Sequence, residues 1–126
     1  MSTTAVANLT IADIAHRLVE LCRVGHFEQA QEELYSEDAL SIEPPQSQGM
    51  QSVKGLEQIK EKGRAFQAMI ENVHSSSLTG PVIGGNYFSI GLIMDVTLKG
   101  MGRQHMAELC VYEVKDGKVI KEQFFS

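Results

Sequence analysis

The sequence is short of basic residues: 11 Lys and Arg stand against 16 Asp and Glu, and the net charge is -5 at pH 7. A protein that binds nucleic acid needs a basic surface to neutralise phosphates, and this chain lacks the charge for one. An anionic membrane surface would repel it for the same reason. We therefore expect neither a nucleic-acid partner nor a membrane partner.

Cysteine and long apolar runs are also scarce. Cys22 and Cys110 lie far apart without CxxC spacing, and each falls on the apolar stripe of its own segment, as buried free thiols do. No apolar run approaches the roughly 18 residues that a membrane-spanning helix needs. The first residues also lack the basic and apolar regions of a secretory signal. The expected location is the cytoplasm.

Motifs for metals, cofactors and nucleophilic serines are missing as well. None of the four histidines has the paired spacing of a metal site. The glycine-rich segments 80–85 and 100–102 lack phosphate-binding spacing, and no serine lies in a GxSxG motif. We expect no metal and no cofactor. His74 and His105 fall in strands from which they could reach a cavity, although a structural role is the simpler interpretation.

The 126 residues are enough for one domain, which we expect over residues 1–126, with 1–8 as a flexible N-terminal segment. Apolar residues at three- and four-residue spacing predict helices beginning at Ile11, Phe27 and Leu56, the first capped by Thr10 and stopped by Gly25. Alternating residues and turn signals predict strands over 39–43, 73–79, 87–98, 103–114 and 119–125, with Gly80-Pro81 ending the second of these. The order α-α-β-α-β-β-β-β predicts an α+β fold, with helices on one face of a long, curled antiparallel sheet.

The first hairpin predicts a cluster of acidic residues. If the loop around residues 99–102 closes symmetrically, Asp95 and Glu108 become diagonal neighbours on one mixed face of the sheet. Cys110 and Tyr112 share this face, the opposite face is apolar, and Arg103 falls on the face opposite Asp95.

The second hairpin leaves two registers open. A three-residue loop with a glycine bulge around Asp116-Gly117 pairs Glu122 with Cys110 and Phe124 with Glu108, so that a third carboxylate joins the cluster. A two-residue turn moves Glu122 to the opposite face.

Crowded carboxylates on a partly apolar wall raise one another's pKa, which makes a carboxyl group a usable general acid or base near neutral pH. The alternative is a set of solvated or ion-paired residues on an exposed sheet face. The candidate catalytic residues are Asp95, Glu108 and Tyr112. The candidate pocket-lining residues are Glu43, Phe66, His74, Cys110, Glu122 and Phe124.

Several segments, taken in order, resemble a known family. They are Leu34–Ala39 (LYSEDA), Gly55–Ile59 (GLEQI), Met94–Thr97 (MDVT), Val111–Val119 (VYEVKDGKV) and Glu122–Phe125 (EQFF). From about residue 9 onward the chain resembles the SnoaL-like branch of the nuclear-transport-factor-2-like (ketosteroid isomerase-like) superfamily. The resemblance implies a cone formed by a curled sheet and three helices, which encloses a pocket and commonly dimerises through the sheet.

The resemblance also implies where a site would lie. By the resemblance, the general base of ketosteroid isomerase corresponds to Glu43. The helix tyrosine of that enzyme falls at Leu18. Its strand acid falls at or next to Cys110, and Glu108 lies one step along the same face. The oxyanion donors of that enzyme are thus absent or displaced. The limonene epoxide hydrolase pattern, an arginine between two aspartates, also fails if Arg103 faces away from Asp95.

The superfamily holds both enzymes and non-catalytic binding modules, so the fold does not give the function. The expected function is binding of a small, mostly apolar molecule, with cofactor-independent acid-base chemistry of the isomerase, cyclase or dehydratase type as its enzymatic form. The alternative is a non-catalytic ligand-binding module or a dimeric assembly module. The sequence leaves open whether the protein is an enzyme.

Overall fold

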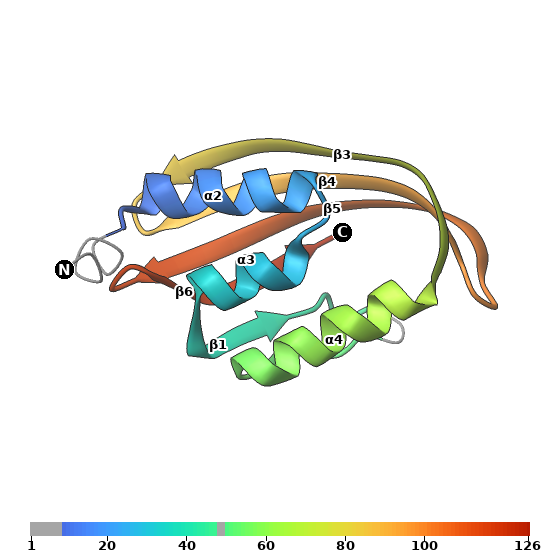
Figure 1. The fold of residues 1–126 in the computed structure, drawn as a ribbon, viewed down its shortest axis with the longest axis horizontal. Helices are drawn as coiled ribbons and strands as arrows, with labels where there is room; N and C mark the ends of the chain where they lie inside the picture. The colour runs from blue at the N-terminus through green and yellow to red at the C-terminus, as the bar shows by residue number, and fades with distance from the viewer. Residues whose placement is uncertain (1–8, 48–49) are drawn as a thin grey trace.

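The computed structural model describes residues 9–47 and 50–126, so the expected flexible segment 1–8 lies outside the described residues. The elements are α2 (Ile11–Arg23), α3 (Phe27–Leu34), β1 (Tyr35–Ile42), β2 (Val53–Lys54), α4 (Leu56–Met69), β3 (Ile70–Gly84), β4 (Tyr87–Leu98), β5 (Gly102–Lys115) and β6 (Lys118–Phe125). The predicted α+β fold is confirmed, with the short strand β2 as an addition (Figure 1).

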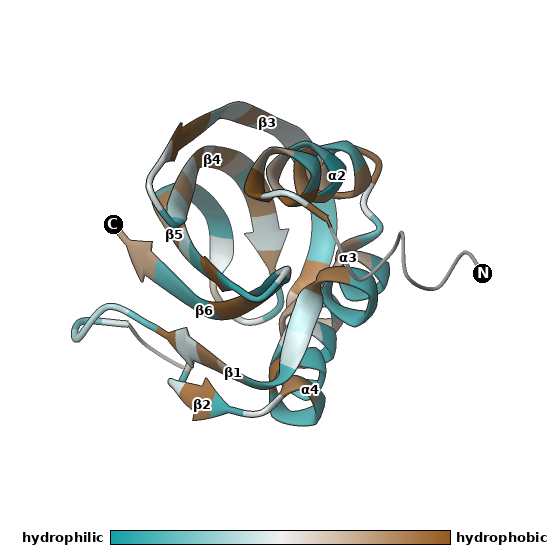
Figure 2. Ribbon diagram, turned by 90° about the vertical axis from the view of Figure 1, so that its left-hand side faces the viewer, coloured by the Kyte–Doolittle hydropathy of each residue, from teal (hydrophilic) through white to brown (hydrophobic). Residues whose placement is uncertain are grey.

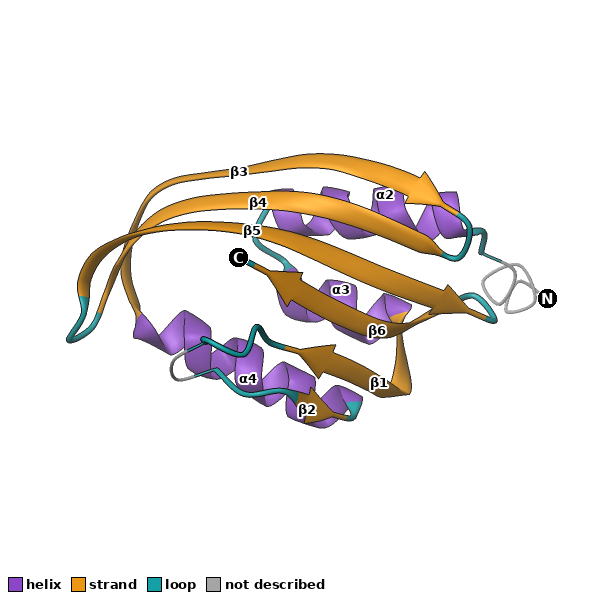
Figure 3. Ribbon diagram, turned by 180° about the vertical axis from the view of Figure 1, so that it is seen from behind, coloured by secondary structure: helices purple, strands orange, loops and turns teal. Residues whose placement is uncertain are grey.

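The six strands form one sheet in the order β2-β1-β6-β5-β4-β3. All neighbours pair antiparallel except β1 and β6, which are parallel. The sheet curls along its long strands and the helices cover its inner side, as Figure 2 and Figure 3 show from two directions.

Local sequence explains the first helix and the core that it covers. The Thr10 hydroxyl accepts a hydrogen bond from the Asp13 backbone N–H at 3.1 Å, and the Thr10 N–H donates back to the Asp13 carboxylate. The apolar stripe that follows buries Ile14 and Leu18 against the sheet, where Phe88 is also buried. None of the described helices is long and apolar enough to span a membrane.

The register of β4 and β5 differs by one residue from the predicted register. Leu98 pairs with Gly102 across a three-residue loop, which Gly100 and Gly102 allow because both have positive φ. Asp95 therefore pairs with His105, and Glu108 pairs with Leu92. Because a one-residue shift exchanges the faces of a strand, the predicted grouping of Asp95 with Glu108 is wrong.

The second hairpin combines features of both predicted registers. Asp116 and Gly117 form a two-residue turn with positive φ at both residues, and the register then shifts between Glu113 and Val114. Tyr112 consequently pairs with Glu122, and Cys110 with Phe124. The predicted pairing of Glu122 with Cys110 is wrong, but the register shift brings Glu122 to the face that Tyr112 occupies.

The predicted end of a strand at Gly80-Pro81 is also wrong. Strand β3 continues to Gly84, and its register with β4 shifts between Thr79 and Val82. Gly80 has a φ of 103° and lies so close to β4 that an added Cβ would meet the Ser89 carbonyl oxygen at 2.9 Å. The irregularity lets one long strand follow the curl of the sheet.

Candidate functional site

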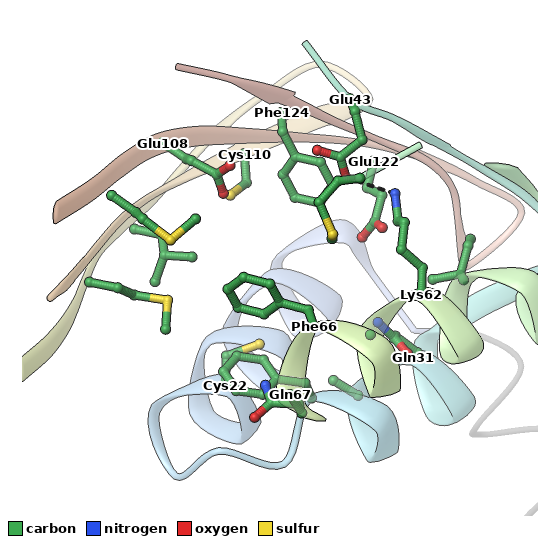
Figure 4. Close-up of a pocket in the computed structure, with 18 of the residues that line it drawn as sticks. Cys22, Gln31, Glu43, Lys62, Phe66, Gln67, Glu108, Cys110, Glu122 and Phe124 are labelled. Atoms are coloured by element: carbon green, nitrogen blue, oxygen red, sulfur yellow. Dashed lines mark hydrogen bonds and ion pairs between the residues drawn. The ribbon is translucent and has the colours of Figure 1, made fainter. Parts of the chain in front are cut away.

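A cavity of about 330 Å³ lies between the inner face of the sheet and the three helices. Most of its lining is apolar, and Figure 4 shows Phe66 of α4 across from the strand that carries Glu108 and Cys110. The apolar lining includes Leu18, Ile59, Phe66, Met69, Leu78, Ile90, Leu92, Met94, Leu98, Met106 and Phe124. A space of this size and lining is typical of a small-molecule site.

One end of the cavity is charged. The Lys62 ammonium of α4 donates to the Glu43 carboxylate at 2.7 Å and to the Ser41 hydroxyl at 2.7 Å. The side chains of Lys62 and Glu43 are only 11% and 8% exposed. The same ammonium lies 5.6 Å from the centre of the Phe124 ring, a distance typical of a cation–π contact.

The hydrogen bonds continue from Lys62 to a fully buried carboxyl group. The Ser41 hydroxyl donates to Glu122 at 2.6 Å, and the Tyr35 hydroxyl donates to the other oxygen of the same carboxyl. Burial raises the pKa of Glu122, and the hydrogen bonds from Ser41 and Tyr35 offset part of this rise because they favour the ionised form. Tyr35, Ser41, Glu122, Lys62 and Glu43 thus form one continuous chain of polar contacts.

Glu108 lies on the same inner face, toward the apolar part of the cavity. Its side chain is partly buried, and no residue within 9–47 or 50–126 forms a hydrogen bond or an ion pair with it. Burial raises the pKa of Glu108, and repulsion by Glu43 and Glu122 adds to the rise, while Lys62 opposes it. A carboxyl group in this environment can gain and release a proton closer to neutral pH than an exposed one.

The other candidate residues on the inner wall are the Cys110 thiol and the Tyr112 hydroxyl. Burial raises the pKa of the Cys110 thiol to about 12, and that of the Cys22 thiol, which also lines the cavity, to about 12. Both thiols are therefore neutral at pH 7 and poor nucleophiles. The Tyr112 ring stacks on Phe88 with centroids 4.7 Å apart, and burial raises the pKa of its hydroxyl, which stays protonated and able to donate.

Asp95 and His74 lie on the outer face of the sheet, away from the cavity. Asp95 accepts two hydrogen bonds from Arg103, at 2.9 and 2.8 Å, and these lower the pKa of its carboxyl. His74 contacts the Thr97 hydroxyl at 2.8 Å. The predictions that placed Asp95 at the pocket and Arg103 on the face opposite Asp95 are wrong because of the shifted register of β4 and β5. His74 was also misplaced, because it lies on β3 where the register with β4 shifts between Val73 and Ser75.

Three residues of the polar chain were not identified from the sequence. Lys62 lies three residues after Ile59 and four before Phe66, so it occupies a position of the apolar stripe of α4. A lysine in such a stripe is a detectable signal for a buried charge. Ser41 and Tyr35 carry no comparable signal, because inward-facing hydroxyls are common in strands.

Comparison with known proteins shows the family and agrees with the fold. A model of the SnoaL-like domain matches residues 9–126, and the chain belongs to this family. No curated protein sequence matches the chain. The described residues contain no group of three or more His, Cys, Asp or Glu side chains placed to hold a metal ion.

Solved structures with the same fold include one at 34% identity, from Mesorhizobium loti, described as a candidate SnoaL-like polyketide cyclase. The match covers 94% of this chain and 100% of that chain, with a TM-score of 0.87. A ketosteroid isomerase-like fold from Catenulispora acidiphila, in complex with trimethylamine, is 18% identical at a TM-score of 0.70, over 93% of this chain and 87% of that one. An NTF2-like protein of unknown function from Burkholderia pseudomallei is 10% identical at a TM-score of 0.74, over 90% and 88%.

Proposed function

We propose that the cavity binds a small, mostly apolar molecule and that Glu108 transfers a proton to or from it, in a cofactor-independent reaction of the isomerase, cyclase or dehydratase type. The observation that carries this proposal is the position of Glu108. It is a partly buried carboxyl group on the wall of an apolar cavity, with its pKa raised by burial and by two neighbouring carboxylates.

The chemistry follows from the groups around Glu108. The ionised carboxylate removes a proton from an acidic C–H bond of the bound molecule, and the protonated form returns a proton to another atom. The Tyr112 hydroxyl on the same wall is the candidate donor to an oxyanion formed in that step, because Lys62 is already paired with Glu43. The apolar walls exclude water, which strengthens each of these interactions.

Hydrogen–deuterium exchange tests this proposal without knowledge of the natural substrate. The probe is 2-tetralone in buffered D₂O, and ¹H NMR follows the loss of the C–H signals next to its carbonyl group. We expect the wild-type protein to accelerate the exchange and Glu108→Gln to remove the acceleration, by at least about tenfold. Asp95→Asn, on the outer face, is the matched control and should keep it. No acceleration by the wild-type protein, or equal acceleration by Glu108→Gln, would contradict the catalytic proposal.

A separate observation favours homodimer formation through the outer face of the sheet. Ile93, Leu109 and Phe125 are apolar residues on this face with exposed fractions of 52%, 47% and 46%. Leu109 pairs directly with Phe125, and the partner of Ile93 is two residues from Leu109 along β5, so the three form a patch. Such a patch is typical of a surface that another protein covers.

The dimer is tested by light scattering coupled to size-exclusion chromatography. We expect a mass of two chains for the wild-type protein and of one chain for Leu109→Lys, because a charge in the patch opposes its burial. A single-chain mass for the wild-type protein at high concentration would contradict the dimer. If dimers form but neither exchange nor ligand binding is found, the non-catalytic assembly module is the better description. The two free cysteines fit the reducing cytoplasm that we propose as its location.

A further inference from the structure

The charges that line the cavity are unbalanced. Near Glu108, the described side chains that face the interior include the carboxyl groups of Glu43, Glu108 and Glu122 but only the ammonium of Lys62. Two other charged residues line the cavity. Glu28 forms an ion pair with Arg64 and Lys60 forms one with Glu32, and the side chains of Arg64 and Glu32 are exposed. The interior therefore carries a negative potential that a bound molecule must tolerate.

Lys62, the cation among the described side chains near Glu108, already has its partners. Lys62 donates to Glu43 and to Ser41, and its ammonium lies against the ring of Phe124. Glu122 is occupied as well, because Tyr35 and Ser41 both donate to it. Glu108 is thus the interior charged group that no described residue engages, and Figure 4 shows it beside Cys110, with Phe124 between it and Lys62.

The surroundings of Glu108 define the opposite, apolar end of the cavity. Met106 precedes Glu108 by two residues on the same face of β5, and it pairs with Met94 of β4. Met69 and Phe66 of α4 pack against the same cluster. Methionine side chains adapt to ligands of different shape, so the surroundings of Glu108 accept an apolar body.

On this basis, and resting on the proposed ligand-binding role of the cavity rather than on proton transfer by Glu108, we propose that its ligands carry a cationic amine head that pairs with Glu108, with an apolar body packed on Met94, Met106 and Phe66. An ammonium group donates a charge-assisted hydrogen bond to Glu108 and relieves its repulsion from Glu43 and Glu122. The faces of nearby aromatic rings also attract a cation in a desolvated site.

The same arrangement disfavours a carboxylate head and a neutral hydroxyl or carbonyl head. A carboxylate head would place a negative charge beside the Glu108 carboxyl, in a space where the ammonium found among the described residues near Glu108 is already paired. A neutral hydroxyl or carbonyl head can form a hydrogen bond with Glu108 but leaves the excess negative charge uncompensated. The structure therefore predicts the order of affinity amine, alcohol, carboxylate for ligands with the same apolar body.

Three compounds with one aromatic body test this order: 2-naphthylmethylamine, 2-naphthalenemethanol and 2-naphthoate. Isothermal titration calorimetry at about pH 7.5 gives the Kd of each compound for the wild-type protein, for Glu108→Gln and for Asp95→Asn. We expect the amine to bind at least about tenfold more tightly than the alcohol, as a charge-assisted hydrogen bond implies. Glu108→Gln should remove this advantage and leave the Kd of the alcohol nearly unchanged, and Asp95→Asn should change neither.

Each failure has a distinct meaning. If the alcohol binds as tightly as the amine, or if the advantage of the amine survives Glu108→Gln, the amine assignment is overturned while the proposed cavity function stands. If none of the three compounds binds, the proposed ligand-binding function fails and the amine assignment fails with it. Should Glu108→Gln not fold, the comparison of the three head groups on the wild-type protein still decides the order.

Discussion

The two faces of the β4–β5 hairpin treat a carboxylate in opposite ways. On the outer face Asp95 accepts two hydrogen bonds from Arg103, whose side chain is 60% exposed, and the pKa of Asp95 is lowered. On the inner face burial and two neighbouring carboxylates raise the pKa of Glu108, which no described side chain engages. Arg103 lies largely in solvent although the Asp95 side chain is only 10% exposed, whereas the partly buried Glu108 faces a mostly apolar cavity.

The difference shows that a carboxylate in a strand gains its character from the face that it occupies. Asp95 has a permanent partner in Arg103, and the two form a structural ion pair. The ionised Asp95 carboxylate is a poor proton donor at neutral pH. Glu108 has a perturbed proton affinity and an open position beside it, which are the properties expected of a functional group. One residue of register decides which of the two acids lies in the cavity.

The largest expected effect comes from breaking the ion pair on the inner face. Lys62→Met leaves the buried Glu43 carboxylate without its partner, and we expect the free energy of unfolding to fall by about 3 kcal/mol. The matched change on the outer face, Arg103→Met, should cost less because Arg103 is 60% exposed and water can take its place beside Asp95. Urea denaturation of both variants gives the comparison, and an equal loss for the two would mean that the inner pair is solvated.

A smaller effect is expected from the buried hydrogen bond at the far end of the polar chain. Tyr35→Phe removes one of the two donors to the fully buried Glu122 and should lower the free energy of unfolding by about 2 kcal/mol. Tyr87→Phe is the control, because Tyr87 is 46% exposed. If both variants had the stability of the wild-type protein in urea, the hydrogen bond from Tyr35 to Glu122 would not stabilise the fold.

The smallest effect is a difference in pH dependence between the two faces. The raised pKa of Glu108 means that its contribution to stability is full below its ordinary value of 4.5 and is lost as the pH rises through the raised value. The lowered pKa of Asp95 gives the opposite sign: its contribution is present above 3.8 and is lost as the pH falls.

Urea midpoints measured from pH 3 to pH 8 separate these contributions. The stability difference between the wild-type protein and Glu108→Gln should change above pH 4.5, and the difference for Asp95→Asn should change below 3.8. A Glu108→Gln curve parallel to that of the wild-type protein above pH 4.5 would show that the carboxyl of Glu108 is not perturbed.

Much of the fold follows from local patterns that the sequence displays. The capping box at Thr10 and Asp13, the stripe from Ile11 to Cys22 and the Asp116-Gly117 turn each specify local geometry. The strand that runs through Gly80-Pro81 was missed because two residues that usually end a strand here accommodate its curl against β4. The parallel pairing of β1 with β6 was missed because these strands are distant in the sequence.

The candidate site was predictable only in part, because registers depend on turns that composition does not fix. Glu108, Glu122 and Tyr112 share the inner face as one of the predicted registers implied, although the structure reaches this result through a two-residue turn followed by a register shift. Asp95 was misplaced because Leu98 pairs with Gly102 across a three-residue loop, instead of facing Arg103 across a symmetric loop. Lys62 was overlooked because the stripe of α4 was read from its apolar residues alone, although Lys62 lies between Ile59 and Phe66 on it.

The most direct test of the central claim is a site-resolved NMR titration of the Glu108 and Asp95 carboxyl carbons in one sample. Glu108→Gln and Asp95→Asn assign the two resonances. We predict that Glu108 titrates above 4.5 and Asp95 below 3.8, since burial governs the first and Arg103 the second. A Glu108 carboxyl that titrates at or below 4.5 would contradict the claim that the inner face holds a carboxyl group adapted for proton transfer.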